Sequence, residues 1–426
     1  MNAILQKKQS TIVLLAVTVA FAVNFSVWTL YSVMGIELDQ RLNLSNTEMG
    51  LLLSAPIITG ALLRLPVGLL CERYSAKSIF LIQMLVIILP LLLLPSIDSF
   101  SGYLLIGLLI GISGVSFTIG IRYITDWFEG NKQGTAMGIF GAGNAGAALS
   151  LILIPVIDST WGWQFIGPFY AGMVFCTFLL FWLLAPATPY YLQAKKQTNL
   201  HFYIKPLTQP KVWRFGLYYY FVFGSFLALI LWLPQYYVNA YKLELNQAMA
   251  LTLLFVISSS MARAAGGWFA DRFGARSINW GVFWICLVCL FFLSYPPTTM
   301  TIHGTEKNVE LFIELNVWVF TLLLLIIGLA QGFGRASVYK LVNDYYPEQM
   351  GSVGGLVAML GALGGCTLPI MFGIAVDLVG VYSACFMILY GVLAACMLLM
   401  HLAIKRERYN QRVDDATRVN FLELDD

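Results

Sequence analysis

Long apolar segments dominate this chain, and they recur twelve times. About 20 apolar residues cross a bilayer as an α-helix. Hydrophobic residues make up 59% of the 426 residues and charged residues only 11%, against about 25% charged in soluble domains. Because no water-soluble packing could cover so much apolar surface, we expect a multi-pass membrane protein. The predicted spans are 11–35, 46–70, 78–97, 101–125, 134–157, 166–186, 214–239, 246–270, 277–296, 315–342, 351–376 and 381–403.

The longest polar stretch between spans follows the sixth of them and is rich in lysine and proline. Such a composition is typical of a linker. We therefore predict an N-terminal six-helix bundle in 1–186, a linker in 187–213, a C-terminal six-helix bundle in 214–403 and a tail in 404–426.

The basic residues of the loops predict the orientation. An even number of spans places both termini on one side, and the loops of that side carry most of the loop lysines and arginines. The other side has only Arg41, Lys242 and Lys307. The positive-inside rule therefore predicts that both termini, the linker and the tail are cytoplasmic. We expect the inner membrane of a bacterium, with the lipid bilayer as the chain's constant partner.

Composition also bears on the class of protein. The net charge of +3, from 25 basic and 22 acidic residues, does not suggest a nucleic-acid partner. The seven cysteines lie mostly in apolar segments and show neither disulfide nor metal-ligand spacing. No nucleophile–base pair or phosphate-binding glycine loop is visible either. We expect a monomer that is not an enzyme and that has no metal and no cofactor.

The two halves of the chain repeat each other. The segment 64–78 aligns without a gap with 263–277, an offset of 199 positions, and two later blocks align at an offset of 218. We expect the 19 extra residues of the second half in the loop around 297–314. Parallel six-helix repeats are a design of secondary transporters. The fold class predicted is therefore an all-α membrane protein with twelve transmembrane helices in two pseudo-symmetric bundles.

One loop segment carries a superfamily motif. Residues 267–276 read G-W-F-A-D-R-F-G-A-R, which resembles the G-x-x-x-D-R-x-G-x-R loop of the major facilitator superfamily, and 68–77 is an eroded copy. The resemblance implies that this loop helps to hold the cytoplasmic side closed, although loop charges can also be plain topology signals. The motif residues concerned are Glu72, Arg73, Asp271, Arg272 and Arg276.

Two glycine-rich segments are more specific. Residues 138–148 and 354–369 resemble the paired signatures of the nitrate/nitrite porter family. Arg64 and Arg263 stand where that family keeps two anion-binding arginines, and 223–226 also follows its pattern. The resemblance covers the whole chain and implies uptake or exchange of nitrate or nitrite.

Physical reasoning supports an anion site at the same arginines. A guanidinium at the centre of a membrane helix costs roughly 2.5–3.5 kcal/mol, so it is retained when it faces a wet cavity or an anion. Arg64 and Arg263 lie about 13 Å from the helix end, and their spans contain no nearby carboxylate. Arginine suits an oxyanion because its planar fork donates two hydrogen bonds. The alternative is that both side chains snorkel to the headgroups.

Further residues join this expected site. An amide at Asn144 could donate to the anion or join two helices, and Arg335 has no acid near it in the sequence. The expected substrate-binding set is Arg64, Arg263, Asn144, Tyr219, Phe117, Phe223 and Arg335.

Two more cations lie near the cytoplasmic ends of their spans. Arg122 and Lys340 each precede an aspartate, Asp126 and Asp344, by four residues, which is the spacing of a helical ion pair. We expect either an intrahelical pair or a gate contact. The glycines of the two signatures are expected to allow close helix packing; they are Gly138, Gly141, Gly143, Gly146, Gly361, Gly364 and Gly365.

The sequence leaves the cargo and its coupling open. The leading hypothesis is a transporter of a small anion by alternating access, with nitrate and nitrite first. The extra cations favour a mono- or dicarboxylate porter as the alternative, and a membrane sensor is a remote third. His201, His303 and His401 lie in loops or at a span end, so exchange fits better than a proton relay, and symport with the substrate stays open.

Overall fold

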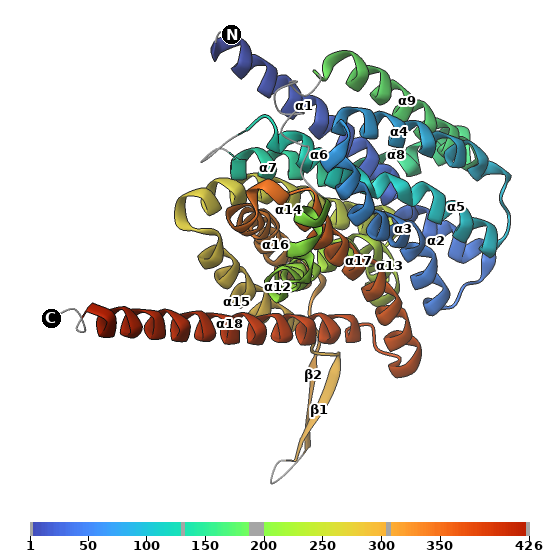
Figure 1. Cartoon of the computed structure of the whole chain (residues 1–426). Helices are drawn as coiled ribbons and strands as arrows, with labels where there is room; N and C mark the ends of the chain where they lie inside the picture. Colours follow the sequence, from blue (N-terminus) through green and yellow to red (C-terminus); the bar gives the residue numbers. More distant parts are fainter. Residues whose placement is uncertain (1–2, 129–132, 187–199, 304–307, 423–426) are drawn as a thin grey trace.

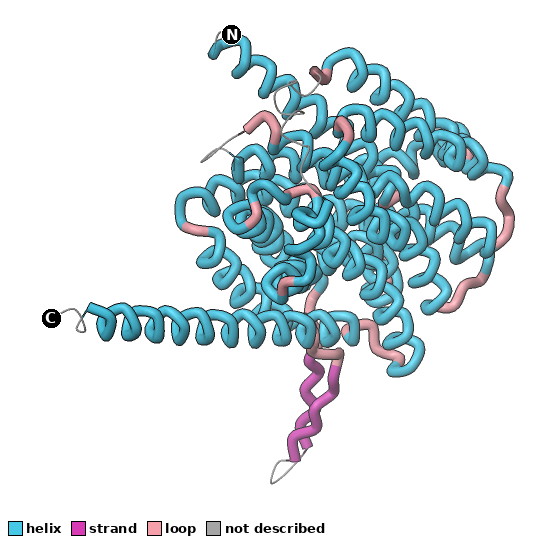
Figure 2. Tube along the Cα trace, viewed as in Figure 1, coloured by secondary structure: helices cyan, strands magenta, loops and turns pink. Residues whose placement is uncertain are grey.

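The chain forms a bundle of long helices. The computed structural model describes residues 3–128, 133–186, 200–303 and 308–422. Within these residues every one of the twelve predicted spans is helical, so the predicted fold class is confirmed (Figures 1 and 2). The spans are built from α1 Ala3–Trp28 and α2 Tyr31–Leu42, α3 Asn46–Arg73, α4 Ala76–Leu93, α5 Phe100–Ile110 and α6 Ser116–Thr125, α7 Gln133–Gly141 and α8 Gly146–Trp161, α9 Ile166–Leu184, α12 Pro210–Tyr219 and α13 Phe226–Tyr241, α14 Leu245–Phe273, α15 Ala275–Leu293, α16 Val317–Tyr345, α17 Ser352–Val379 and α18 Ala384–Leu422.

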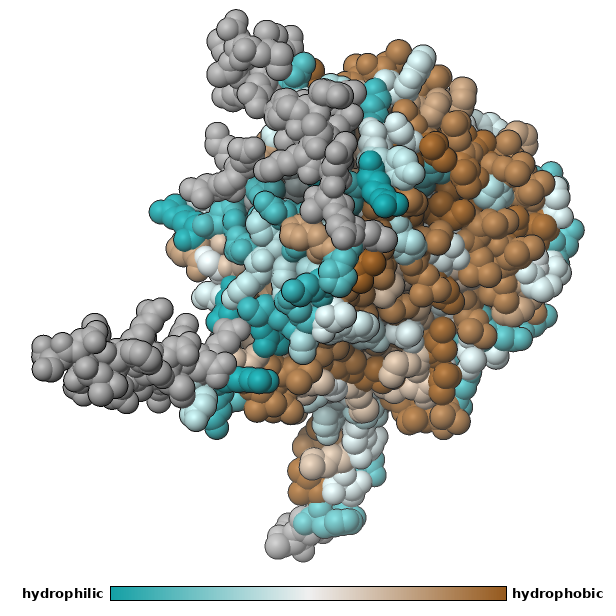
Figure 3. All heavy atoms as spheres, viewed as in Figure 1, coloured by the Kyte–Doolittle hydropathy of each residue, from teal (hydrophilic) through white to brown (hydrophobic). Residues whose placement is uncertain are grey.

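Hydrophobic side chains cover much of the outside of the bundle, because these helices meet lipid on one face and other helices on the opposite one. Leu89, Leu183 and Leu378 are 63%, 70% and 80% exposed. Figure 3 shows hydrophobic residues as a broad brown area on the right side of the view. A helix that is apolar all round fits this environment and no aqueous one.

The two halves meet along two related helix pairs. α3 of the first half packs against α17 of the second, and α7 packs against α14. Glycine makes both contacts close: a Cβ on Gly68 would overlap the carbonyl of Gly351, and one on Gly267 would overlap the carbonyl of Gly134. Small residues therefore let backbones approach where lipid supplies no hydrophobic drive for association.

Three spans are interrupted by a short segment that is not α-helical. A 3₁₀ segment, Gly111–Val115, separates α5 from α6, and another, Ala142–Ala145, separates α7 from α8. A π segment, Tyr220–Ser225, separates α12 from α13. Such segments inside helices often occur at functional sites. These interruptions were not predicted from the apolar pattern, which is continuous through all three spans.

The structure differs from the expected boundaries in three places. The seventh span begins at Pro210 rather than 214, after a short helix α11 Leu200–Ile204, while 187–199 lies outside the described residues. α18 continues without a break from the membrane to Leu422. The extra residues near 297–314 form an antiparallel hairpin of β1 Thr298–His303 and β2 Asn308–Ile313. The limits of the two bundles themselves stay a prediction.

Candidate functional site

Three arginines are buried together inside the bundle. Arg64 on α3, Arg263 on α14 and Arg335 on α16 are 0%, 1% and 0% exposed. Within the described residues, none of them forms an ion pair with a carboxylate. The alternative of snorkelling does not fit this burial. Uncompensated charge in a low-dielectric interior is costly, so the arrangement points to an anion that arrives from outside the chain.

Arg64 links the two halves. Its Nε donates to the carbonyl of Gly114 at 3.1 Å, in the 3₁₀ segment of the fourth span, and its Nη1 donates to the carbonyl of Ala358 on α17 at 2.8 Å. Its Nη2 is buried and has no partner among the described residues. The guanidinium carbon lies 4.7 Å from the ring centroid of Trp28 and 5.2 Å from that of Phe223. One corner of this fork can therefore still donate to a ligand.

Arg263 contacts both a phenol and an amide. Its Nη2 donates to the hydroxyl of Tyr219 at 3.3 Å. With the amide oxygen of Asn144 turned toward the arginines, which is the orientation that satisfies the amide, Arg263 Nη1 donates to it at 2.8 Å. The Nε of Arg263 is buried without a partner among the described residues. Like Arg64, this guanidinium keeps a free donor.

Arg335 is held more completely. Its Nη2 donates to the hydroxyl of Ser259 at 2.6 Å and to the carbonyl of the same residue at 2.9 Å. Its Nε donates to the carbonyl of Gln331 at 3.3 Å, and its Nη1 reaches the same Asn144 oxygen at 2.9 Å. The guanidinium carbon lies 3.6 Å from the ring centroid of Phe226. All three nitrogens of Arg335 have partners, so it adds charge and fixes Asn144.

Aromatic rings fill the space between the arginines. The ring of Phe117 lies 5.6 Å from the guanidinium carbon of Arg64 and 5.0 Å from that of Arg263. Phe223 and Tyr219 stack on it, each 6.4 Å between centroids. Cation–π contacts of this kind contribute about 0.5–2 kcal/mol each and do not neutralise the charge. The structure thus brings together all seven residues of the expected substrate-binding set.

Two glycines of the signature segments make room for this site. A Cβ on Gly141 would overlap the guanidinium of Arg263, and one on Gly361 would overlap the ring of Tyr219. The others face helix backbones or apolar side chains. Gly138 lies against the backbone of Arg263, Gly143 and Gly146 against α1, Gly364 against the π segment and Gly365 against Leu227.

On the face of the bundle that carries the two termini, the first half holds the second through Glu72. Its Oε2 accepts from Arg122 Nε at 3.1 Å, and its Oε1 accepts from the backbone N–H of Gly351, just before α17, at 2.8 Å. Arg122 also pairs with Asp126. Arg122 thus forms the intrahelical pair and also contacts Glu72, which joins the two halves; its role as a gate contact stays a prediction.

The second half mirrors this arrangement through Asp271. Its Oδ2 accepts from the N–H and the hydroxyl of Thr135 on α7, both at 3.0 Å. Lys340 lies 3.4 Å from Asp271 and 3.1 Å from Asp344. Each motif carboxylate thus binds near the N-terminus of a helix in the other half, where the helix dipole favours negative charge.

The motif arginines lie outside these two clusters. Arg73 is exposed. Arg272 stacks against Trp268, with its guanidinium carbon 5.4 Å from the ring, and Arg276 donates to the hydroxyl of Tyr345 at 3.1 Å.

A third contact between halves lies on the opposite face. Asp377, near the end of α17, accepts from Asn46 Nδ2 at 2.8 Å, from the N–H of Thr47 at 3.0 Å and from its hydroxyl at 2.5 Å. Asp377 was not among the predicted site residues, because nothing in a single sequence pairs the end of one span with the start of another. Since the halves are joined on both faces around buried arginines, the conformation is occluded.

Comparison with known proteins gives one family and several relatives. The model of the Major Facilitator Superfamily matches residues 16–309. A "Probable nitrate/nitrite antiporter NarK1" of Thermus thermophilus is 35% identical, covering 91% of this chain and 90% of its own. A "Nitrite extrusion protein" of Bacillus subtilis is 28% identical over 90% and 92%, and a "Probable nitrate transporter NarT" of Staphylococcus epidermidis is 27% identical over 92% and 96%.

Solved structures agree in fold. The human organic anion transporter MFSD10 has a TM-score of 0.70 at 15% identity and covers 92% of this chain and 99% of its own. A bacterial homologue of the human lysosomal transporter Spinster, inward-facing and occupied, has a TM-score of 0.68 at 14% identity, covering 93% and 97%. At these identities the likeness concerns the fold alone.

Proposed function

The chain belongs to the major facilitator superfamily, and we propose that it is a secondary transporter that carries nitrate and nitrite across the membrane by alternating access. One observation carries the proposal: Arg64 and Arg263 are buried near each other, without a carboxylate partner among the described residues, and each keeps a free donor. A planar monovalent oxyanion matches the fork of a guanidinium. The relatives named for nitrate and nitrite favour this cargo over a carboxylate.

The residues would divide the work as follows. Arg64 and Arg263, one from each half, take the anion between them, and the Tyr219 hydroxyl adds a donor. Asn144, held by Arg263 and Arg335, sets the geometry of the fork. Phe117 occupies the gap between the two guanidiniums and would shift or stack on the anion when it binds.

Coupling by exchange follows from the same charges. With no carboxylate paired to the three arginines in the described part of the chain, the empty site carries net positive charge. Moving that charge through the apolar bundle is costly, whereas a bound anion lowers the cost. The site would therefore cross mainly when loaded. We propose a monomer in a bacterial inner membrane with both termini cytoplasmic, so that the Glu72 and Asp271 clusters close the cytoplasmic side.

Counterflow in proteoliposomes tests the cargo. Vesicles loaded with nitrite and diluted into labelled nitrate should accumulate label, whereas vesicles loaded with formate or succinate should not. Exchange with carboxylates alone would replace nitrate by an organic anion. Uptake into unloaded vesicles that depends on a pH gradient would show symport with a proton instead of exchange.

If the Asp271 contact closes the cytoplasmic side, its loss should expose residues on that side to a reagent in water. Asp271→Asn removes the charge that holds Thr135 and Lys340, and a hydrogen bond to a charged group contributes about 1.5–3 kcal/mol. Gln133 accepts a hydrogen bond from Asn343 across the same face. In the Asp271→Asn variant, a cysteine placed at position 133 should react with an impermeant maleimide from the cytoplasmic side about tenfold faster than the same cysteine in the protein that keeps Asp271. Glu348→Gln, an exposed carboxylate on that face, is the control. Equal rates in both variants would contradict the role of Asp271.

If the Asp377 contact closes the opposite face, its loss should likewise expose residues on that face. Asp377→Asn weakens the contact with Asn46 and Thr47 and should favour the outward-open state. In this variant, a cysteine at the buried position of Met49 should react with an impermeant maleimide from the periplasmic side about tenfold faster than the same cysteine in the protein that keeps Asp377. The exposed Asp98 on the same face serves as the control in Asp98→Asn. No difference between these variants would remove Asp377 from the closure.

A further inference from the structure

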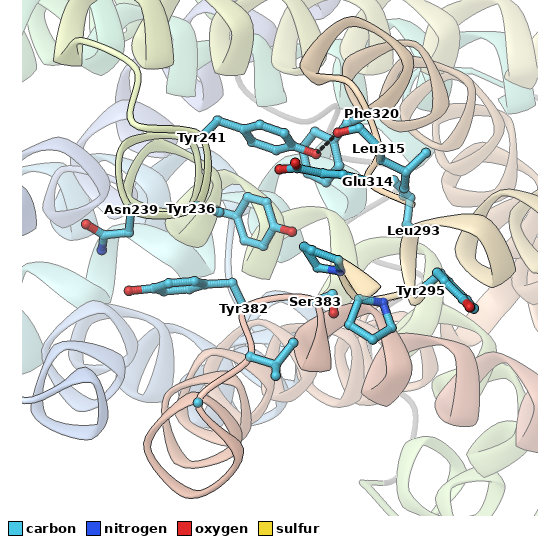
Figure 4. Close-up of a pocket in the computed structure, with 15 residues that line it drawn as sticks. Tyr236, Asn239, Tyr241, Leu293, Tyr295, Glu314, Leu315, Phe320, Tyr382 and Ser383 are labelled. Atoms are coloured by element: carbon cyan, nitrogen blue, oxygen red, sulfur yellow. Dashed lines mark hydrogen bonds between the residues drawn. The ribbon is translucent and has the colours of Figure 1, made fainter. Parts of the chain in front are cut away.

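A cavity that shares no lining residue with the arginine site lies in the C-terminal half, on the face opposite the termini. It has a volume of about 370 Å³, enough for about a dozen waters at their share of liquid volume. Its walls come from the end of α13, the chain on both sides of the β1–β2 hairpin, and the turn 380–383 between α17 and α18 (Figure 4).

The cavity has a rigid aromatic wall. The ring of Tyr236 stacks on Phe320, 5.0 Å between centroids and 1° from parallel, and Tyr382 meets it edge-on at 6.2 Å. Tyr241 is fixed by its hydroxyl, which donates to the carbonyl of Leu315 at 3.1 Å. These contacts fix the shape of the cavity without a ligand.

The polar groups of the cavity are suited to receive hydrogen bonds from a donor. Figure 4 shows the Tyr236 hydroxyl and the Glu314 carboxylate directed into it from different walls. Ser383 is 4% exposed, lines the cavity, and its Oγ has no hydrogen-bond partner among the described residues. A buried hydroxyl without a partner costs about 1–3 kcal/mol, so a ligand that satisfies it would gain affinity.

The charge of the cavity is opposite to that of the arginine site. The described residues that line it include one carboxylate, Glu314, and no lysine or arginine. We propose that this cavity binds a primary amine whose ammonium group donates to Glu314, with the Tyr236 and Ser383 hydroxyls as further acceptors in the same cavity, while its alkyl part lies against Pro296 and Tyr382. An ammonium has three N–H donors and no acceptor, and tyrosine rings attract cations.

Two sources can supply this chemistry. One is a free primary amine, and the other is the ethanolamine headgroup of a phospholipid, since the cavity lies at the outer end of the spans beside the half-exposed Tyr295. The proposal does not depend on the transport of nitrate, because the ligand has the opposite charge and the cavity shares no lining residue with the arginine site.

Calorimetry on the detergent-purified protein tests the site with n-butylammonium as the probe and 1-butanol as its neutral counterpart. We expect saturable binding of one ammonium per chain and none of the alcohol. Glu314→Gln should weaken binding at least tenfold, and Ser383→Ala should weaken it by a smaller factor. Glu310→Gln, an exposed carboxylate on β2 that does not line the cavity, should leave it unchanged. Equal binding of 1-butanol, or unchanged affinity in Glu314→Gln, would overturn the proposal.

Nanodiscs then distinguish the two sources. In discs of phosphatidylglycerol, which has no ammonium, n-butylammonium should bind as in detergent. A tenfold weaker affinity in phosphatidylethanolamine discs would assign the site to the lipid headgroup, and an equal affinity would assign it to a free amine. Absence of binding in phosphatidylglycerol discs would contradict an ammonium site in the membrane.

Discussion

Replacing Arg64 by lysine is expected to lower nitrite–nitrate counterflow about 100-fold, and replacing Arg263 by lysine should do the same. Lysine keeps the positive charge but loses the planar fork, so it cannot donate two parallel hydrogen bonds to one oxyanion. Losing one charge-assisted hydrogen bond costs about 1.5–3 kcal/mol, which corresponds to roughly 10–100-fold in affinity. In addition, Arg64→Lys would lose one of the carbonyl contacts of this guanidinium, with Gly114 or Ala358.

Two matched variants control for a general effect of the substitution. Arg73→Lys lies on the same helix as Arg64, and Arg272→Lys lies on the same helix as Arg263. Both side chains are outside the buried cluster, so counterflow should stay near that of the unmodified protein. If Arg64→Lys and Arg263→Lys kept more than half of the counterflow activity at equal amounts of protein in the membrane, the proposal that each guanidinium donates two hydrogen bonds to the anion would be wrong.

Replacing Gly141 by alanine is expected to lower the affinity for nitrate about tenfold or more in a protein that still folds. The added methyl group would overlap the guanidinium of Arg263, so either this side chain or the 3₁₀ segment Ala142–Ala145 must move. Either movement would disturb the contact between Arg263 and Asn144, which orients the Arg263 guanidinium toward the anion. Titration of nitrate and thermal unfolding of the same preparation separate a binding defect from a folding defect.

Gly172→Ala is the control for this glycine. An added Cβ there meets no atom within 4 Å, on a helix of the same half. It should leave nitrate affinity unchanged and should not lower the unfolding temperature, since alanine is the better helix former. If Gly141→Ala bound nitrate as tightly as Gly172→Ala, the glycine would serve helix packing only.

The spans and the main charged residues could be predicted from the sequence because both follow from strong local costs. An apolar segment of about 20 residues has few alternatives to a membrane helix. An arginine in such a segment needs a reason to be there; this cost points to Arg64, Arg263 and Arg335, and the family resemblance points to the first two as well. The repeat offset of 199 positions pairs Arg64 with Arg263.

The remaining features depend on contacts between segments that are distant in sequence. Trp28 and Ser259 contact Arg64 and Arg335, yet each looks like an ordinary residue of its own span. Asp377 closes the opposite face only because the N-terminus of α3 lies beside it. The interrupted spans have the same kind of cause, since the broken backbone supplies the Gly114 carbonyl and places Asn144. Spacing and composition contain no information on these pairings.

Direct titration of nitrate into the purified protein tests the central claim that the buried arginines bind an anion. We expect one nitrate per chain, displaced competitively by nitrite, and no measurable binding in the double variant Arg64→Lys/Arg263→Lys. The variant Arg73→Lys/Arg272→Lys should bind as the unmodified protein does. Nitrate bound with the same affinity by both double variants would show that the anion site lies elsewhere in the molecule.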